Sequence, residues 1–299
     1  MRTLSLLIFA VALLNHRRAD AAPVRRMDAP ALAEEPFELV GRVPVVRGSV
    51  NGSEPLNLIL DTGATETVLT PAAARRLGIP TRYFSENQRK ASLRSLSVGS
   101  AALNDISVFV FDPPQALPLR LDRGLDYHGI LGQPFLSRFI TTLDYGRGRV
   151  AFRALPAAAA GALPARMPVP AGAVRVGFDI QEGLIHVQGR INGKGPMTFI
   201  VDTGSAETLL LPSSARSFGV FAVNNDFAPA FVLFDAVTAG EAVARQIPGV
   251  IHAPPHERGY RMTYDGILGT TFLSRFVVTV NYAEHALFFQ PATQRPGGQ

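Results

Sequence analysis

Ile59-Leu60-Asp61-Thr62-Gly63-Ala64 and Ile200-Val201-Asp202-Thr203-Gly204-Ser205 are two copies of one short pattern, in which Asp-Thr-Gly follows apolar residues. The apolar residues predict a buried strand, and the glycine allows the tight turn that follows it. Each copy therefore places a carboxylate at the end of a buried strand. Two facing carboxylates that share one proton can activate water for hydrolysis without a metal or a covalent nucleophile. The repeated pattern predicts that Asp61 and Asp202 meet.

The similarity between the two copies extends well beyond the tripeptide. At a spacing of 141 residues, Ile59–Gly78 matches Ile200–Gly219 at 11 of 20 positions without a gap. At a spacing of 137 residues, Gly129–Gly132 matches Gly266–Gly269, and Phe-Leu-Ser-Arg-Phe follows in both copies. A repeat of about 140 residues indicates a duplicated domain and not a solenoid.

The composition favours a folded, mainly β chain that is long enough for two domains. The 299 residues are 47% hydrophobic, which argues against disorder, and 27 glycines and 23 prolines fit a turn-rich β architecture. The net charge of +5 comes from scattered arginines without interleaved aromatic residues, so no nucleic-acid partner is predicted. The absence of cysteine excludes disulfides, thiol catalysis and thiolate metal sites.

Each copy predicts the same order of short elements. Strands are followed by a short helix that begins at a proline and ends at a glycine, then by a second short helix and a final hairpin. Thr70 is the expected N-cap of the first of these helices. The strands are expected at residues 43–46, 58–60, 184–187 and 199–201, the proline-initiated helices at 71–78 and 212–219, and the hairpins at 140–152 and 277–289.

The repeats divide the chain into six segments. These are a signal peptide at residues 1–21, a flexible tail at 22–36, a first domain at 37–153, an Ala/Pro-rich linker at 154–173, a second domain at 174–291 and a C-terminal tail at 292–299. The prolines of the linker exclude a continuous Ala-rich helix. A removable pro-segment is the alternative interpretation of residues 22–36.

The N-terminus is typical of an export signal. Arg2 precedes the apolar run Leu4–Leu14, and Ala19–Ala21 provides a small-x-small cleavage site. The apolar run has 11 residues, which is too short to span a bilayer, so no stable membrane insertion is expected after cleavage. The alternative is an uncleaved interfacial anchor. The mature protein is therefore expected to be exported, and to be periplasmic or secreted.

The two Asp-Thr-Gly turns, each with an Ile-Leu-Gly segment further along, resemble the pepsin and retropepsin clan of aspartic proteases. The resemblance covers about residues 37–153 and 174–291 and is closest to two retropepsin-type units in tandem in an exported bacterial protein. It implies a mainly β fold of two homologous β-barrel domains, related by a pseudo-two-fold axis, each with one or two short helices. It also implies an aspartic endopeptidase that hydrolyses protein or peptide substrates and uses no cofactor and no metal.

The resemblance also implies a role for each residue of the motifs. Asp61 and Asp202 would be the catalytic pair, Thr62 and Thr203 would hydrogen-bond across the axis, and the glycines would allow tight turns. Apolar packing behind the two turns would come from the Ile-Leu-Gly segments. The support residues are Thr62, Gly63, Thr203, Gly204, Ser205, Ile130, Leu131, Gly132, Ile267, Leu268 and Gly269.

The two copies differ at positions that bear on the chemistry. Ser205 stands where the first copy has Ala64, and we expect its hydroxyl to hydrogen-bond the Asp202 carboxylate. Asp202 would then be the ionised member of the pair and Asp61 the proton carrier. His128 stands where the second copy has Asp265 and is interpreted as a loop residue with a satisfied ring.

Several features remain open at the level of sequence. Glu66 and Glu207 recur after the motifs, and we interpret them as solvated or locally bonded. The flap that covers substrate in this clan is expected within residues 89–110 and, in the second repeat, within 231–246. His252 and His256 have the spacing of a helical metal site, but the two prolines between them exclude the helix.

Two alternatives concern use and assembly. The duplicated fold can serve as a noncatalytic exported binding or regulatory protein, since fold alone does not establish catalysis. The two repeats are expected to pair within one chain because the linker can reach and raises their effective concentration. A homodimer, in which each repeat pairs with its equivalent, is the alternative to this monomer.

Overall fold

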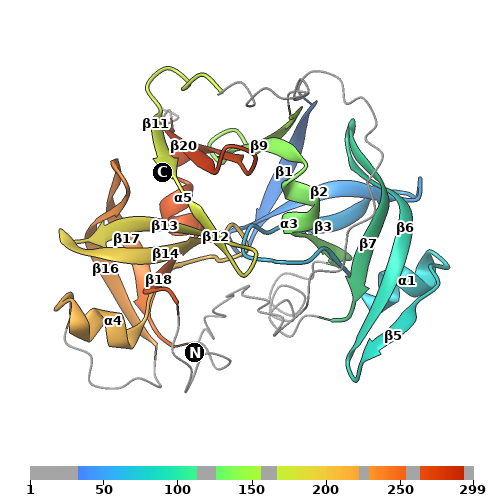
Figure 1. Ribbon diagram of the computed structural model, residues 1–299, viewed down its shortest axis with the longest axis horizontal. Coiled ribbons are helices and arrows are strands. Elements are labelled where there is room, and N and C mark those ends of the chain that lie inside the picture. Colours follow the sequence, from blue (N-terminus) through green and yellow to red (C-terminus); the bar gives the residue numbers. More distant parts are fainter. Residues whose placement is uncertain (1–32, 113–125, 156–166, 222–228, 254–262, 293–299) are drawn as a thin grey trace, which may run out of the picture.

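A computed structural model describes residues 33–112, 126–155, 167–221, 229–253 and 263–292. Two similar lobes lie side by side and are joined by a sheet along one side of the molecule (Figure 1). The expected signal peptide, residues 1–21, lies outside the described residues. None of the described helices is long and apolar enough to span a membrane.

The first domain contains ten strands and two helices among its described residues. These are β1 (Ala33–Val40), β2 (Val43–Val50), β3 (Leu56–Leu60), β4 (Val68–Leu69), α1 (Pro71–Arg76), β5 (Arg82–Ser85), β6 (Gln88–Val98), β7 (Ala101–Val110), β8 (Gly129–Leu131), α3 (Gln133–Leu136), β9 (Phe139–Asp144) and β10 (Arg149–Ala154). Because β1 begins at Ala33, residues 33–36 of the expected tail belong to the folded domain. Thr70 caps α1 by accepting a hydrogen bond from the amide of Ala73.

The second domain repeats this order. Its elements are β11 (Val174–Gly177), β12 (Asp179–Gln181), β13 (Leu184–Ile191), β14 (Lys194–Val201), β15 (Thr208–Leu210), α4 (Pro212–Ser217), β16 (Ala230–Ala239), β17 (Ala242–Ile251), β18 (Gly266–Leu268), α5 (Thr270–Leu273), β19 (Phe276–Asn281) and β20 (Ala286–Pro291). β11 and β12 together occupy the place of β1, since β11 pairs with β20 as the start of β1 pairs with β10.

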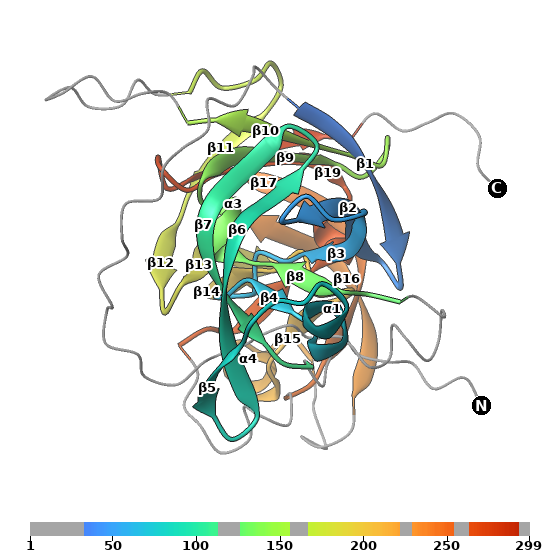
Figure 2. The ribbon, with the colours of Figure 1, turned by 90° about the vertical axis from the view of Figure 1, so that its right-hand side faces the viewer.

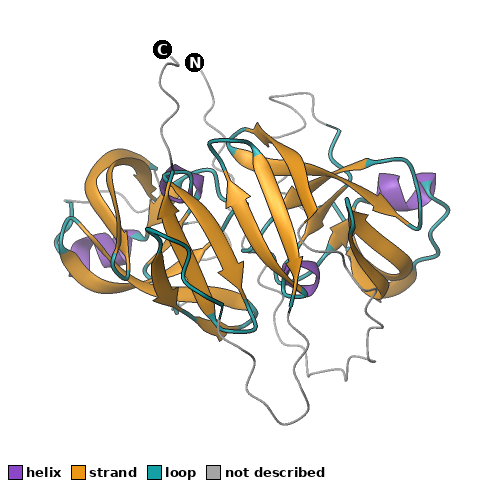
Figure 3. Ribbon diagram, turned by 90° about the horizontal axis from the view of Figure 1, so that it is seen from above, coloured by secondary structure: helices purple, strands orange, loops and turns teal. Residues whose placement is uncertain are grey.

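Each domain closes six strands into a barrel. In the first domain the order is β2-β3-β8-β4-β7-β6, and β2 pairs with β6 to close it. In the second domain the order is β13-β14-β18-β15-β17-β16, closed by β13 and β16. The two barrels are separate layers of strands when the molecule is viewed from above (Figure 3). The prediction of two mainly β barrel domains with few short helices is confirmed.

A shared sheet joins the domains. Its order is β11-β20-β19-β9-β10-β1, so β9 and β19 meet in the middle as antiparallel neighbours. At their crossing, the hydroxyls of Thr142 and Thr279 lie 2.8 Å apart. These two threonines hold equivalent positions in the repeats, so their contact marks the pseudo-two-fold axis. β1 runs from this sheet into the first barrel, as the side view shows (Figure 2).

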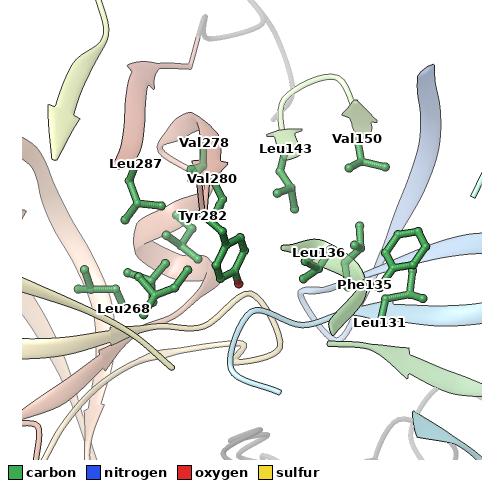
Figure 4. Close-up of a cluster of buried hydrophobic side chains, with 14 of the residues drawn as sticks. Leu131, Phe135, Leu136, Leu143, Val150, Leu268, Val278, Val280, Tyr282 and Leu287 are labelled. Atoms are coloured by element: carbon green, nitrogen blue, oxygen red, sulfur yellow. The ribbon is translucent and has the colours of Figure 1, made fainter. Parts of the chain in front are cut away.

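The main core fills both barrels and the space beneath the shared sheet. In each domain the side chains of the Leu of Ile-Leu-Gly, the following helix and the final hairpin point into this core (Figure 4). Phe135, Phe139 and Phe152 form a triad with ring centroids 5.2–5.9 Å apart. The equivalent rings of Phe272, Phe276 and Phe289 are 5.3–5.9 Å apart.

The Phe152 ring tests the contribution of this triad. Because Phe152 is only 2% exposed, Phe152→Ala should lower the free energy of unfolding by about 3–5 kcal/mol. The control is Phe231→Ala, which truncates a phenylalanine that is 58% exposed and should cost less than about 1 kcal/mol. Urea unfolding of both variants measures the difference. Equal losses would show that the triad adds no packing energy of its own.

Candidate active site

The two aspartates are held by the first residues after parallel strand pairs. β3 pairs with β8, and the amide of Asp61 continues the ladder by donating to the carbonyl of Leu131 at 3.1 Å. β14 pairs with β18 in the same way, and the amide of Asp202 donates to Leu268 at 3.2 Å. The Ile-Leu-Gly segments therefore fix the position of each aspartate through backbone hydrogen bonds as well as apolar packing.

The isoleucine and leucine of each segment face opposite ways. Leu131 and Leu268 belong to the main core. Ile130 instead packs in a smaller cluster with Ala64 and with Ala206 of the other domain. Ile267 packs in an equivalent cluster of the second domain. Each aspartate is thus flanked by apolar side chains on both sides of its strand.

Glycine is required at four motif positions because the backbones approach too closely for a side chain. A Cβ atom at Gly63 would overlap the carboxyl group of Asp202, and one at Gly204 would overlap that of Asp61. Each carboxyl group therefore lies directly against the turn of the other domain. The equivalent atoms at Gly132 and Gly269 would overlap backbone carbonyls of the turns they support.

Thr62 and Thr203 exchange hydrogen bonds across the domain interface. The amide of each donates to the hydroxyl of the other at 3.0 Å. Each hydroxyl then donates, at 2.8 Å, to a carbonyl of the opposite domain, that of Val201 or Leu60. All these groups are buried, so the four bonds hold the two turns in one register without competition from water.

The two carboxyl groups lie at the centre of this arrangement and are at most 1% exposed. They are within hydrogen-bonding reach of each other, and Oδ2 of Asp61 has no other partner among the described residues. Oδ1 of Asp61 accepts from the amide of Gly63, at 2.8 Å. Oδ1 of Asp202 accepts from two amides, those of Gly204 at 2.8 Å and Ser205 at 3.1 Å.

Burial raises the pKa of both carboxyl groups. The pKa of Asp202 is raised to about 6, and that of Asp61 is raised well above its ordinary value, with the charge of Asp202 as the second cause. Backbone amide donors favour the ionised form and oppose this rise. Asp202 has the additional donor, so the pair retains a proton more readily on Asp61.

The expected role of the Ser205 hydroxyl is wrong. The hydroxyl donates to the carbonyl of Glu207, at 2.9 Å, and only the amide of Ser205 reaches the carboxylate of Asp202. The turn after Asp202 directs the hydroxyl along the chain, because a serine side chain readily bonds a backbone group two residues away. The asymmetry between the two carboxyl groups is therefore set by the backbone.

Two tyrosines that the sequence analysis did not identify lie near the pair. Tyr145 and Tyr282 hold equivalent positions at the ends of β9 and β19, and both hydroxyls are buried without a hydrogen-bond partner among the described residues. Burial raises the pKa of both phenols, with a further contribution from Asp202 for Tyr145 and from Asp61 for Tyr282. The signal for them was their recurrence at the spacing of the second repeat block.

A one-sided ion pair also crosses the interface. Arg42, in the turn between β1 and β2, places Nε 3.8 Å from Oε1 of Glu207. Arg42 has φ of 72°, and the equivalent residue of the second repeat is Gly183, with φ of 82°, which packs against Thr65. A side chain in this left-handed conformation is strained, so the first repeat accepts strain where the second uses glycine. Burial raises the pKa of Glu207 and Arg42 lowers it.

The expected flap ranges form hairpins whose turns lie away from the aspartates. The turn between β6 and β7 includes Gly99, which lies against Glu35 of β1. The turn between β16 and β17 includes Gly240, which lies against Val176 of β11. A different hairpin, β5–β6, projects from the first domain on the side away from the shared sheet (Figure 1). His256, the second member of the expected histidine pair, lies outside the described residues.

Comparison with known proteins agrees with this geometry. Residues 46–135, which include the first Asp-Thr-Gly and the first Ile-Leu-Gly, match the aspartyl protease family model. The first domain belongs to the aspartyl protease family. No curated protein matches the chain.

The whole chain has the two-lobed fold of a pepsin-like aspartic proteinase. The crystal structure of the aspartic proteinase from Irpex lacteus is similar over 88% of this chain and 98% of that protein, with a TM-score of 0.56 and 14% identity. At this identity the likeness concerns the fold. The aspartyl protease domain of residues 46–135 and its repeat thus occupy the places of the two lobes.

The threonine exchange gives a direct test of the interface. Thr203→Val removes one hydroxyl and leaves the buried amide of Thr62 and the carbonyl of Leu60 without partners, so it should lower the free energy of unfolding by about 2 kcal/mol or more. Thr203→Ser keeps the hydroxyl and should cost less than about 1.5 kcal/mol. Chemical denaturation of both variants measures the effect. Indistinguishable losses would mean that the hydroxyl contributes nothing.

A second test concerns Ser205. Because its hydroxyl bonds Glu207 and not the carboxylate, Ser205→Ala should leave the titration of the Asp61/Asp202 pair unchanged. The measurement is a carbon-13 NMR titration of the aspartate carboxyl groups in the original chain and the variant. A clear rise in the pKa of Asp202 in the variant would restore the role first expected from the sequence.

Proposed function

We propose that the chain is an aspartic endopeptidase in which Asp61 and Asp202 together activate water for peptide-bond hydrolysis. The observation that carries the proposal is the burial of the two carboxyl groups against each other's turns, with both threonines intact. Two carboxylates in contact at a buried site cannot both ionise cheaply, so one proton is retained between them. This is the protonation state that acid–base hydrolysis requires.

The two carboxyl groups have different tasks in the proposed reaction. The ionised member, for which the second amide donor favours Asp202, takes a proton from a bound water. The protonated member, Asp61, donates a hydrogen bond to the scissile carbonyl oxygen and offsets the charge of the tetrahedral intermediate. Asp202 then returns a proton to the leaving amine. No bond forms between the protein and the substrate.

The proposed peptidase acts after export, as a monomer. The N-terminal Arg2, the apolar run Leu4–Leu14 and the Ala19–Ala21 cleavage site support export. Pairing of the two repeats in the described chain supports one complete site per molecule. We therefore expect activity to be proportional to enzyme concentration at high dilution, without the loss that a dissociating dimer would show.

The raised pKa values predict how stability depends on pH. Between the ordinary aspartate pKa of 3.8 and the raised values, the folded chain keeps protons that the unfolded chain releases, so stability falls as pH rises through this window. Asp202→Asn removes one of the coupled groups and should flatten the fall. Unfolding free energies measured from pH 4 to pH 7 provide the comparison. An equally steep fall in the variant would remove the pair as its cause.

The catalytic proposal is tested by single substitutions at both aspartates. Asp61→Asn and Asp202→Asn should each reduce cleavage of a casein or peptide-library substrate at acidic pH by at least about 1,000-fold, because neither half can act alone. Activity should also decline as pH rises above the upper pKa of the pair. The control is Asp235→Asn, at an exposed position of β16, which should cleave normally.

The alternative, a noncatalytic binding or regulatory protein, makes the opposite prediction. A chain that folds, as judged by circular dichroism, but cleaves no member of a diverse peptide library from pH 3 to pH 7 would support it. Full activity in either aspartate variant would instead exclude the shared pair while leaving peptidase activity in place.

A further inference from the structure

His128 occupies the place in the first repeat that Asp265 occupies in the second. In both repeats the backbone of this residue is bonded on two sides: its amide donates to Asn57 or Thr198, and its carbonyl accepts from Thr70 or Leu211. These residues immediately precede β8 and β18, the strands that support the two aspartates. The backbone contacts are therefore the same in the two halves, and only the side chains differ.

The two side chains perform the same task with different chemistry. Nδ1 of His128 accepts a hydrogen bond from the amide of Asn57 at 3.0 Å. Oδ2 of Asp265 accepts from the amide of Thr198 at 2.8 Å. Asp265 also accepts from the Ser214 hydroxyl at 2.7 Å, and the first repeat has Ala73, which has no hydroxyl, at that position. The neighbouring residue thus differs in step with the acceptor.

The bonded amide lies at the start of the strand that delivers the catalytic carboxyl group. Asn57 is the second residue of β3, and Asp61 follows the end of the same strand. His128 immediately precedes β8, so its ring bonds the first rung of the β3–β8 pair, whose last rung is the bond from Asp61 to Leu131. A change at His128 therefore acts on Asp61 through a strand pair of only a few residues.

We propose that His128 is a positioning residue for Asp61 that acts only as a neutral imidazole, so that acidification loosens the first half of the site and not the second. An imidazole accepts at Nδ1 only while that nitrogen carries no proton. Protonation would set a new N–H against the N–H of Asn57 and break the bond. A carboxyl group keeps an acceptor oxygen in either protonation state, so Asp265 has no such limit.

The charged groups around the ring are distributed over three segments. Asp126 lies in the same segment, with Oδ2 3.3 Å from Nε2 of His128, and favours the protonated ring. Arg76 of α1 and Arg47 of β2 oppose protonation. Burial is the largest effect, since His128 is 8% exposed, and the net result is a lowered pKa. The unfolded chain therefore binds this proton first, and stability falls as pH decreases through the ordinary histidine range toward the lowered pKa.

The tautomer is the most direct test. If Nδ1 accepts from Asn57, the proton of the neutral ring must be on Nε2. His186 provides an internal control, because its Nδ1 lies 3.1 Å from the carbonyl of Leu184 and must therefore carry the proton. A long-range proton–nitrogen NMR spectrum at neutral pH should show the two histidines as opposite tautomers. A proton on Nδ1 of His128 would overturn the proposal.

Variants separate the loss of the acceptor from its titration. His128→Asn keeps an acceptor oxygen that does not titrate, and His128→Ala removes the acceptor. Between pH 7 and pH 5, hydrogen-exchange protection of the Asn57 amide, corrected for intrinsic rates, should fall about tenfold or more in the original chain. It should stay constant in His128→Asn and should already be low at pH 7 in His128→Ala. The control His285→Asn changes an exposed histidine of the second domain and should behave like the original chain.

The double substitution Ala73→Ser/His128→Asp installs the acceptor and hydroxyl of the second repeat and should also remove the pH dependence of the Asn57 amide. If His128→Asn keeps the pH dependence of the original chain, another group causes it and the proposal fails. The same holds if the original chain shows no fall in protection once the ring is protonated.

The final arm concerns catalysis and rests on the proposed function. In peptide cleavage from pH 3 to pH 7, His128→Asn should keep its activity to lower pH than the original chain, with kcat changing more than KM because Asp61 is displaced. If cleavage occurs and the two acid limbs coincide, His128 does not position Asp61. If no substrate is cleaved, the proposed function fails, and the tautomer and exchange measurements still decide the state of His128.

Discussion

The structure depends on one constraint: two carboxyl groups must be buried in contact at the interface between two domains. Burial of an ionised group is costly unless hydrogen bonds or a shared proton compensate for it. Here the compensation is reciprocal, because each carboxyl group lies against the glycine turn of the opposite domain. Neither domain alone can provide that environment. The threonine exchange and the shared sheet both serve to keep the two turns in this relation.

The sequence was sufficient to predict the features that the duplication records twice. The two barrels, the proline-initiated helices and the meeting of Asp61 with Asp202 all follow from patterns that occur in both repeats. Features that occur once were harder to predict. The strand residues 33–36 contain two glutamates and a proline, and they are ordered by pairing with β10, more than a hundred residues away, which no local pattern reveals.

Errors at the site have a common physical origin. The hydroxyl of Ser205 and the ring of His128 were interpreted from their residue types, but the backbone around each decides its partner. Ser205 turns toward the carbonyl of Glu207 because the turn brings that carbonyl within reach. His128 accepts from Asn57 because its own backbone is already fixed on both sides. The Arg42–Glu207 pair depends on how the domains dock, which composition and spacing cannot specify.

Divergence between the repeats is concentrated where backbone geometry is preserved. Arg42 replaces a glycine in the same left-handed turn position, and His128 replaces an aspartate with the same amide partner. In both cases a conformation is kept while the charge or titration of the side chain changes. A homodimer of identical chains must carry every such residue in both halves. Fusion of the two halves into one chain removes that requirement, so one half of the site can acquire a sensitivity to pH that the other half does not share.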